Sequence, residues 1–463
     1  MGKGIKKYIG LVLLMMGMGL AAHAQSPNVN GAVTVGLSSG SLSGNLCMTN
    51  LLKLDSYAIV LHRGLNVASF TKNGEALVYG GFYGGEFVDE GVKYTLRESF
   101  KAKDELCVSY TGGFPVFMVD EGEKNVLDWK GNIAFNGKSI RATEQSKWYP
   151  ILMDPNSGQT WKEVTYEIAV DCEECNSIYV NGSAPQKGPQ AVFTSEVPRV
   201  LLILAGDIDF TEAAGLYFVN GNVGEEQAQA IKTGIAEISA FFEDYLDIAY
   251  DDNPTFMSFA SVSKDRKINQ STWGFNSWPS IGLDGRLDFN TLIGEDGTIA
   301  NWIWSSLSHE MGHYYFGTVL VPRGVYSWFF IEGTTEYLAL KAVQALKGEK
   351  PYTAKLKNYY NSVSRMPNPT PFHKITEREQ LDGTYRYRLA PMYLVALEDY
   401  IGKERVQEAL SRLLKAKDGD VVYADFMKAA VKAGASKDDI RRFEAECLEK
   451  KVTESCLTKW AGD

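Results

Sequence analysis

The sequence predicts an α+β protein in which an N-terminal all-β sandwich precedes a mixed segment and a mostly helical C-terminal segment. Residues 25–200 contain short runs of alternating polar and apolar residues separated by turn signals, a pattern typical of a β-sandwich. From Gly224 onward apolar residues recur with helical spacing, and beyond residue 390 strand signals are few. We therefore expect a signal peptide (1–24), a β-sandwich domain (25–200), a middle domain (201–365) and a helical C-terminal part (366–463).

The first residues are expected to form a secretory signal peptide. Three lysines precede a short apolar stretch at residues 8–20, and Ala22-His23-Ala24 is typical of a cleavage site. The apolar stretch is too short to anchor the chain in a membrane, and no later apolar run reaches spanning length. Cleavage would make Gln25 the first residue of an exported, periplasmic or extracellular protein.

The charge balance argues against nucleic acid as a partner. The formal net charge is −10 at pH 7, and loss of the three signal-peptide lysines would make it −13. A protein with a negative net charge repels phosphate groups and anionic lipids. We therefore expect no nucleic acid partner and no membrane insertion.

Five runs in the first part are expected to be strands, because their apolar residues alternate with polar ones or are β-branched and aromatic. Turn signals such as Asn73-Gly74 and Asn181-Gly182 separate the runs. The runs are residues 51–54, 57–61, 65–70, 106–110 and 164–170.

Six cysteines, an even number in a chain expected to be exported, favour disulfides. Proximity favours a bond between Cys447 and Cys456, and a bond between Cys47 and Cys107 would then join two N-terminal strands. Cys172 and Cys175 could close a tight loop at a strand end. The alternative for this last pair is half of a zinc site, although no second half is visible.

The middle of the chain is expected to mix strands and helices. Residues 200–204 and 255–260 are expected to be strands. Residues 224–250 are expected to be helical, because Ile231, Ile235 and Ile238 fall on one face. Two further helices are expected at about 300–317 and 328–346, and a proline-rich loop at 366–371.

The helix expected at 300–317 carries the motif His309-Glu310-Met311-Gly312-His313. Histidines four positions apart project from one helix face, so both imidazoles can reach one tetrahedral Zn²⁺. Glu310 points roughly 100° around the helix, a direction that suits a base acting on zinc-bound water better than a third ligand. Glu332, on the next expected helix, would be the third ligand and would leave an open position, as in catalytic zinc sites.

Short motifs of this kind also occur by chance on surface helices, so the surroundings of this one matter. Residues 301–307 are apolar and aromatic, which predicts a largely buried helix. Buried histidines and a glutamate require strong partners, and a metal ion provides them. Of the remaining histidines, His62 and His373 lack any motif and are expected to be structural or surface residues.

These residues resemble the aminopeptidase N family of zinc peptidases. After the second histidine that family continues with an aromatic residue, Phe-Gly, a valine and a proline or small residue, as do residues 314–322 here. Its glutamate ligand is followed by a glycine, two small or apolar residues, a variable position and a tyrosine, as in Glu332-Gly333-Thr334-Thr335-Glu336-Tyr337. The β-rich first part is similar in type. The resemblance covers most of the mature chain and is specific only around residues 309–337.

The resemblance implies a thermolysin-like catalytic domain over residues 201–365, with one Zn²⁺ held by His309, His313 and Glu332. It implies hydrolysis of an N-terminal peptide bond, with Glu310 as the general base that acts on a zinc-activated water. The family also uses a tyrosine to assist the oxyanion. Counting back from the glycine that closes the next helix, Gly402, gives Tyr387, or Tyr385 if the register slips; both could instead be surface aromatics.

Glu336 follows Glu332 by one helical turn, so the two side chains face the same way. Ligating histidines usually donate their second N–H to a carboxylate or carbonyl, and Glu336 could be that acceptor. It could equally be a plain solvated glutamate.

Two features depart from the family pattern. The family usually carries Gly-x-Met-Glu-Asn shortly before the zinc helix, and its glutamate holds the free amine of the substrate. Here residues 273–277 occupy roughly that place without a glutamate, and the spacing does not select between Asp284 and Asp288 as a replacement. Larger members also continue well beyond the tyrosine as a helical domain that covers the cleft, which leads to the hypothesis that an uncovered cleft here admits longer peptides or proteins.

We therefore expect an exported zinc metallopeptidase that acts on peptides or proteins, with aminopeptidase activity as the first expectation. An endopeptidase on the same zinc site is one alternative. A non-catalytic zinc-containing binding protein is another, and the presence of Glu310 argues against it. The sequence leaves the oligomeric state and the side-chain preference open.

Overall fold

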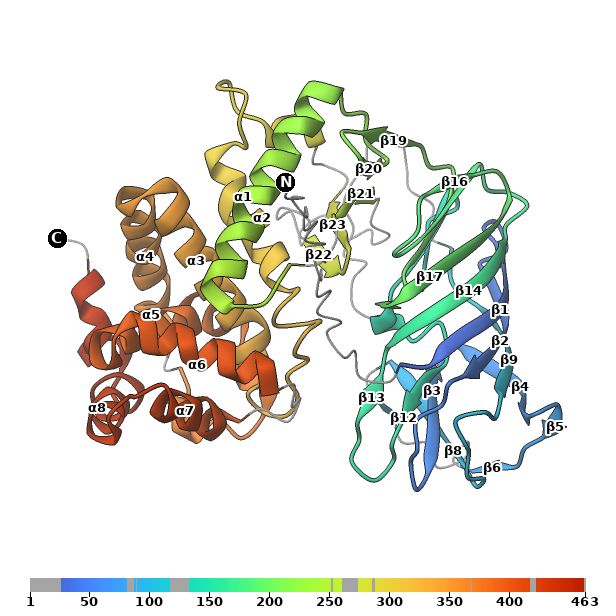
Figure 1. Ribbon diagram of the computed structural model, residues 1–463, viewed down its shortest axis with the longest axis horizontal. Helices are drawn as coiled ribbons and strands as arrows, with labels where there is room; N and C mark the ends of the chain where they lie inside the picture. Colours follow the sequence, from blue (N-terminus) through green and yellow to red (C-terminus); the bar gives the residue numbers. More distant parts are fainter. Residues whose placement is uncertain are drawn as a thin grey trace, which may run out of the picture.

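The structure, a computed structural model, describes residues 26–80, 87–88, 90–116, 133–250, 253–259, 274–284, 288–367, 369–416 and 422–461. The expected signal peptide (1–24) lies outside these residues. Figure 1 shows a β-rich part formed by the first half of the chain, a helical part formed by the second half, and a smaller sheet between them. The expected α+β fold class is confirmed.

In the segments that the structure describes, three sheets build the β-rich part. A seven-stranded sheet has the order β17-β14-β1-β2-β9-β4-β5, in which only β1 and β14 run parallel. A six-stranded sheet contains β13-β12-β3-β8-β6 with β7 paired to β8, and a five-stranded sheet has the order β10-β11-β18-β15-β16. The strands are β1 Asn28–Gly36, β2 Ser41–Thr49, β3 Tyr57–His62, β4 Leu65–Lys72, β5 Glu75–Ala76, β6 Tyr79–Gly80, β7 Phe87–Val88, β8 Gly91–Leu96, β9 Leu106–Gly113, β10 Ala134–Phe135, β11 Ser139–Ala142, β12 Ile151–Met153, β13 Thr160–Trp161, β14 Glu163–Asp171, β15 Ser177–Val180, β16 Gln186–Lys187, β17 Gln190–Val200 and β18 Ile203–Gly206.

One hydrophobic core joins the three sheets. Leu42 of the seven-stranded sheet, Ile59 of the six-stranded sheet and Ile140 of the five-stranded sheet are fully buried in it. The alternation read from the sequence accounts for this arrangement, since β14 buries every second residue.

The strand expected at residues 51–54 is absent. Asn50 adopts a left-handed backbone (φ 52°), which ends β2 after Thr49. Residues 51–54 then form a loop before β3 begins at Tyr57.

The strand expected at residues 200–204 is displaced. β17 ends at Val200 and β18 begins at Ile203. The Leu201 carbonyl between them accepts a hydrogen bond from the Trp148 indole (3.2 Å). Because β18 pairs with β11 and β15, the sheets of the β-rich part include chain beyond residue 200.

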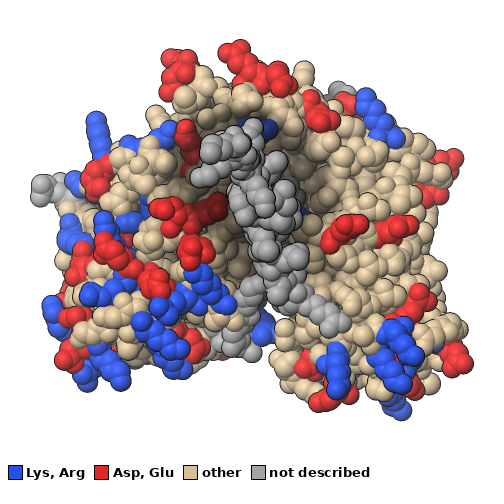
Figure 2. Space-filling view, in the orientation of Figure 1, with Lys and Arg blue, Asp and Glu red and all other residues tan. Residues whose placement is uncertain are grey.

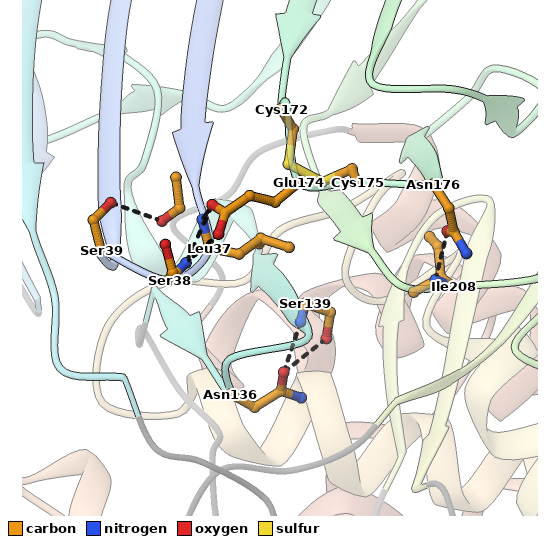
Figure 3. Close-up of a disulfide and its surroundings, with 11 residues drawn as sticks. Leu37, Ser38, Ser39, Asn136, Ser139, Cys172, Glu174, Cys175, Asn176 and Ile208 are labelled. Carbon is orange, nitrogen blue, oxygen red and sulfur yellow. Dashed lines mark hydrogen bonds between the residues drawn. A yellow bond between two sulfur atoms is a disulfide. The ribbon is translucent and has the colours of Figure 1, made fainter.

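All three expected disulfides are present: Cys47–Cys107, Cys172–Cys175 and Cys447–Cys456. The second closes the tight loop after β14, so this pair is not half of a zinc site. Figure 3 shows that Glu174, inside the loop, accepts hydrogen bonds from the backbone N–H groups of Leu37 (2.6 Å) and Ser38 (3.1 Å). The loop thereby fastens the turn between β1 and β2.

The smaller sheet has the order β19-β20-β21-β23-β22, which makes β22 an edge strand. Helix α1 (Glu225–Leu246) buries the predicted face of Ile231, Ile235 and Ile238, and it is capped by Asp247, which has φ 54°. The strands are β19 Phe210–Ala213, β20 Leu216–Val219, β21 Thr255–Phe259, β22 Gly274–Ser277 and β23 Ser280–Asp284.

Helices and short helical turns dominate the described residues from 289 onward, as expected. They are α2 Asn301–Gly312, α3 Thr334–Lys347, α4 Glu349–Val363, α5 Ala390–Ile401, α6 Lys403–Ala416, α7 Tyr423–Lys432 and α8 Lys437–Phe443. The described residues also contain three π-helical turns, η3 Phe329–Gly333, η6 Tyr385–Leu389 and η7 Glu444–Leu448. Short 3₁₀ turns are η1 Glu144–Ser146, η2 Phe289–Leu292, η4 Phe372–Lys374, η5 Arg378–Gln380, η8 Val452–Glu454 and η9 Cys456–Trp460. Among the described residues, no helix combines the length and apolar character needed to cross a membrane.

Helix α2 is shorter than expected. It ends at Gly312 rather than near residue 317, and tight turns follow. Gly317 sits so close to the preceding turn that a Cβ there would lie 2.7 Å from the His313 carbonyl oxygen. The chain can turn away from the helix at this point only because residue 317 is glycine.

Candidate metal centre

Three side chains from two helical segments converge on one point. His309 and His313 lie at the end of α2, with ring centroids 4.8 Å apart and ring planes at 89°. Glu332 of η3 places its Oε2 atom 3.3 Å from Nε2 of His309 and 3.4 Å from Nε2 of His313. The structure thus brings together the three residues predicted as metal ligands, with all ligand atoms within 4.8 Å of one another.

These separations fit a tetrahedral metal ion. Ligand atoms about 2.0–2.1 Å from one ion at tetrahedral angles lie about 3.3–3.4 Å apart. The Oε2 atom of Glu332 is buried and has no hydrogen-bond partner among the described residues, a costly arrangement unless a cation binds there. Two imidazoles and a carboxylate are ligands that Zn²⁺ accepts, and three protein ligands leave a fourth position open.

The two side chains that approach α2 from the following helices both come from π-helical turns. Glu332 lies in η3, which runs directly into α3, and Tyr387 lies in η6, which runs directly into α5. A π turn contains one extra residue, so it redirects a side chain without ending the helix, and such turns are frequent at functional sites. Gly333 allows the two segments to touch, because a Cβ there would lie 2.6 Å from Cβ of Ala390.

Hydrogen bonds behind the ligands orient both imidazoles. Nδ1–H of His309 donates to Oε2 of Glu336 (2.7 Å), and Nδ1 of His313 lies 3.5 Å from the Phe316 carbonyl oxygen. Each ring therefore turns Nε2 toward Glu332. Glu336 is buried, so of the two alternatives the structure supports the acceptor and not the solvated glutamate.

Glu336 is itself held by α4. The Tyr359 hydroxyl donates to its Oε1 atom, and the Lys355 ammonium lies 3.9 Å from the same oxygen. No sequence signal marks these two residues, because Lys355 and Tyr359 have ordinary helical spacing and belong to no motif.

The charges of the centre favour a cation between the imidazoles and the carboxylates. Burial lowers the pKa of His309, but the carboxylates of Glu332 and Glu336 outweigh it and raise the pKa to about 10. Burial raises the pKa of Glu332, but His313 and His309 outweigh it and hold that pKa below its usual range. The pKa of Glu336 is likewise lowered to about 2, with His309 as the main opposing influence to burial.

Glu310 lies beside the three ligands and against β22. A Cβ on Gly274 would lie 3.2 Å from Oε1 of Glu310, and the Asn276 amide donates to the Glu310 carbonyl oxygen (2.8 Å). Burial raises the pKa of the Glu310 carboxyl. Its position and raised pKa suit a group that takes up and releases a proton.

The structure distinguishes the two candidate tyrosines by position. The Tyr387 ring centroid lies 5.8 Å from that of His309, and its side chain is partly exposed. Tyr385 is only 1% exposed and packs near Tyr393 (6.5 Å between centroids). Tyr387 thus faces the centre, and burial followed by the nearby charge of Glu332 raises its pKa.

Other residues singled out from the sequence lie elsewhere. His62 is buried in β3, where its Nδ1 atom accepts a hydrogen bond from the Gly64 N–H (2.9 Å), and His373 is exposed. Asp288 is exposed and accepts from the Asn290 N–H (2.9 Å) as the N-cap of η2. The side chain of Asp284 lies outside the described residues.

The hairpin β22–β23, which borders Glu310, is hydrogen-bonded to the β-rich part. Asn181 donates to the Trp278 carbonyl oxygen (2.8 Å) and accepts from the Ser280 hydroxyl (2.5 Å). The Ser277 hydroxyl donates to Oε2 of Glu144 (3.0 Å). A buried polar network therefore fixes one wall of the centre to the first part of the chain.

No protein-family model and no curated protein matches the sequence. Solved structures do match. The structure is similar to that of an M1 zinc metallopeptidase from Deinococcus radiodurans, with a TM-score of 0.63, 14% identity, and coverage of 92% of this chain and 94% of that chain.

Two further structures give the same result. A mutant of the Deinococcus radiodurans enzyme bound to a Tyr-Ser-Ala substrate matches with a TM-score of 0.63, 15% identity, and coverage of 91% and 93%. Native leukotriene A4 hydrolase from Saccharomyces cerevisiae matches with a TM-score of 0.61, 15% identity, and coverage of 92% of this chain and 67% of that one. At these identities the likeness shows the fold, and it confirms the fold implied by the sequence resemblance.

Proposed function

We propose that the protein is an exported zinc metallopeptidase that acts as an aminopeptidase. The observation that carries the proposal is the placement of His309, His313 and Glu332 at separations that fit one tetrahedral ion, with Glu310 beside them. These four residues lie in the proposed catalytic domain (201–365), and Tyr387 comes from the proposed helical C-terminal part (366–463).

Bound zinc would polarise the scissile carbonyl and lower the pKa of a water molecule in the open position. Glu310 would take the proton from that water and deliver it to the leaving amine. The Tyr387 hydroxyl, which its raised pKa keeps protonated, would donate a hydrogen bond to the developing oxyanion. Glu336 would hold His309 in the orientation that presents Nε2 to the ion.

Three further observations support parts of this proposal. Three disulfides favour an oxidising compartment, in agreement with the expected signal peptide. Peptide substrates agree with the Tyr-Ser-Ala ligand of the similar bacterial enzyme. Figure 2 shows the surface hollowed between the β-rich and helical parts, with acidic side chains beside the hollow, as would suit a positively charged N-terminus.

The decisive experiment compares the purified protein with Glu310→Gln and His313→Ala. We expect Glu310→Gln to keep stoichiometric zinc and lose nearly all peptide hydrolysis, because the amide cannot accept the proton. His313→Ala should lose the metal, as elemental analysis would show. Wild-type turnover by Glu310→Gln would refute the assigned base.

Comparing free and N-acetylated peptides then separates the two kinds of peptidase. An aminopeptidase should fail on the blocked peptides. Internal cleavage of blocked peptides would instead establish the endopeptidase alternative on the same zinc site.

A further inference from the structure

Arg386 is a cation beside the metal centre that has no acidic partner in the described part of the chain. It lies in the π turn η6, directly before Tyr387, and is half-buried. Its guanidinium forms no ion pair or hydrogen bond with any described residue, and its Nε atom is buried without an acceptor. A guanidinium has five N–H donors, and a buried donor without an acceptor is unfavourable. This position is therefore suited to an anion that arrives with the substrate.

Two aromatic rings hold the Arg386 guanidinium in place. Its central carbon lies 4.3 Å from the centroid of the Trp328 ring and 5.1 Å from that of the Tyr387 ring. Contacts with ring faces leave the N–H groups at the edge of the guanidinium plane available to a further acceptor. The aromatic contacts therefore orient Arg386 without neutralising its charge.

Nearby carboxylates do not serve as the missing partner. Asp382, one turn earlier, accepts a hydrogen bond from the Tyr385 N–H (2.8 Å). Glu379 lies 3.4 Å from Nε of Arg378, whose guanidinium also contacts the Trp328 ring (5.3 Å). Two arginines thus meet at one ring, and the nearby carboxylates leave the charge of one of them unbalanced.

Arg386 lies close enough to the metal centre to contact a bound peptide. The Tyr387 ring centroid is 5.8 Å from that of His309 and 5.1 Å from the central carbon of Arg386, which places this carbon at most about 11 Å from the His309 ring. The residue after the scissile bond can extend a side-chain carboxylate roughly 6 Å from the reacting carbonyl carbon, and an arginine–carboxylate pair adds about 4 Å between carbon atoms. These lengths together are on the scale of the available distance.

The sign of the charge assigns Arg386 to one end of the substrate. The free N-terminus of an aminopeptidase substrate is an ammonium group, which a guanidinium repels. When the first peptide bond is cut, the C-terminus and every side chain except the first belong to the leaving group. A carboxylate that reaches Arg386 from this end would meet a cation that has no other partner.

We propose that Arg386 binds a carboxylate in the leaving-group part of the peptide, and this inference rests on the proposed peptidase function. Such a carboxylate belongs either to an acidic side chain directly after the scissile bond or to the C-terminus of a short peptide. The planar guanidinium suits both sources, because it can donate two parallel hydrogen bonds to a carboxylate. Arg386 would then make the enzyme selective for the charge of the leaving group.

The test uses the zinc-loaded full chain and three peptides: Tyr-Glu-Ala amide, Tyr-Gln-Ala amide, and Tyr-Gln-Ala with a free C-terminus. The first two differ only in a side-chain carboxylate, and the last two differ only in a C-terminal carboxylate. Release of tyrosine gives kcat/KM for each peptide. We expect the wild type to prefer at least one carboxylate peptide over Tyr-Gln-Ala amide by roughly 10-fold, mainly through KM, because one charge-assisted hydrogen bond is gained.

The Arg386→Gln variant should bring this preference close to 1 while zinc content stays stoichiometric, because the amide carries no charge. A purely structural role, in which Arg386 only places Tyr387, would slow all three peptides by the same factor and leave the preference intact. Arg412→Gln is the matched control, because Arg412 is exposed on α6 and pairs with Glu408 (2.7 Å). It should keep both the rates and the preference of the wild type.

The outcomes separate the two proposals. A wild type that cleaves neither these peptides nor Tyr-Ser-Ala would refute the peptidase function itself. A wild type that cleaves the three peptides equally would overturn only the role of Arg386, as would an Arg386→Gln variant that keeps the wild-type preference. If Arg386→Gln does not fold, Arg386→Met serves instead, because its stem can still pack on Trp328 without a charge. A preference that persists in this variant would again overturn the assignment.

Discussion

Replacement of Glu336 should weaken metal binding even though this residue contacts no metal. Its Oε2 atom lies 2.7 Å from Nδ1 of His309, and it raises the basicity of that ring while fixing its orientation. Loss of such an outer partner typically costs 10–100-fold in metal affinity, or about 1.4–2.7 kcal/mol. In Glu336→Gln the amide oxygen can still accept the hydrogen bond from the His309 N–H, so we expect zinc affinity to fall only about 10-fold. Glu336→Ala removes the acceptor, and we expect its zinc affinity to fall about 100-fold.

The measurement is a zinc Kd from competition with a chromogenic chelator at pH 7.5. Tyr359→Phe removes one hydrogen bond to Glu336, and we expect it to weaken zinc binding by a smaller factor than Glu336→Ala does. Glu408→Gln is the matched control, because Glu408 is exposed on α6 and pairs with Arg412 (2.7 Å), far from any metal ligand in sequence. A zinc Kd for Glu336→Ala equal to that of the control would show that the bond to His309 does not support the metal.

Two other predictions concern packing and protonation. Gly333→Ala should destabilise the fold by about 1–3 kcal/mol in urea unfolding, because the new methyl group would overlap Ala390, whereas Gly383→Ala enters open space and should be near neutral. In chelator-treated protein, the pKa of His309 in the folded state (about 10) exceeds its ordinary value of 6.5. The protonated ring therefore contributes fully to the free energy of unfolding below pH 6.5, and this contribution is lost as the pH rises through 10. The pKa of Glu336 in the folded state (about 2) lies below its ordinary value of 4.5, so its carboxylate contributes to the free energy of unfolding above pH 4.5, and this contribution is lost as the pH falls through 2. The melting temperature of the metal-free protein should therefore decline between pH 6.5 and 10, and a value that stays constant over that interval would contradict the charge assignment.

The three metal ligands could be predicted from the sequence, but for two different reasons. His309 and His313 are four residues apart on a helix, so helix geometry places them on one face. Glu332 lies on a separate helical segment, and it was predicted because the residues that follow it resemble a family motif. Glu336 was recognised as one of two alternatives, and only its burial against Tyr359 decides between them.

Other features could not be read from the sequence, because they depend on contacts between distant segments. The π turns around Glu332 and Tyr387 have no recognisable pattern of their own, and the register of Tyr387 depended on them. The loop at residues 51–54 has the alternation of a strand but follows a left-handed Asn50. Glu144 carried no motif, and its relation to Ser277 exists only in the folded chain.

The bonds from Asn181 to the β22–β23 hairpin have a consequence for how this architecture can be divided. The strand that flanks Glu310, β22, is an edge strand of the small sheet. Its hairpin is held in position by Asn181, which lies about a hundred residues earlier in the sequence. The first half of the polypeptide therefore acts as a scaffold for the reaction chamber. A chain trimmed to the helical half would leave the hydroxyls and carbonyls of that hairpin facing solvent, and its catalytic groups would lack one of their supports.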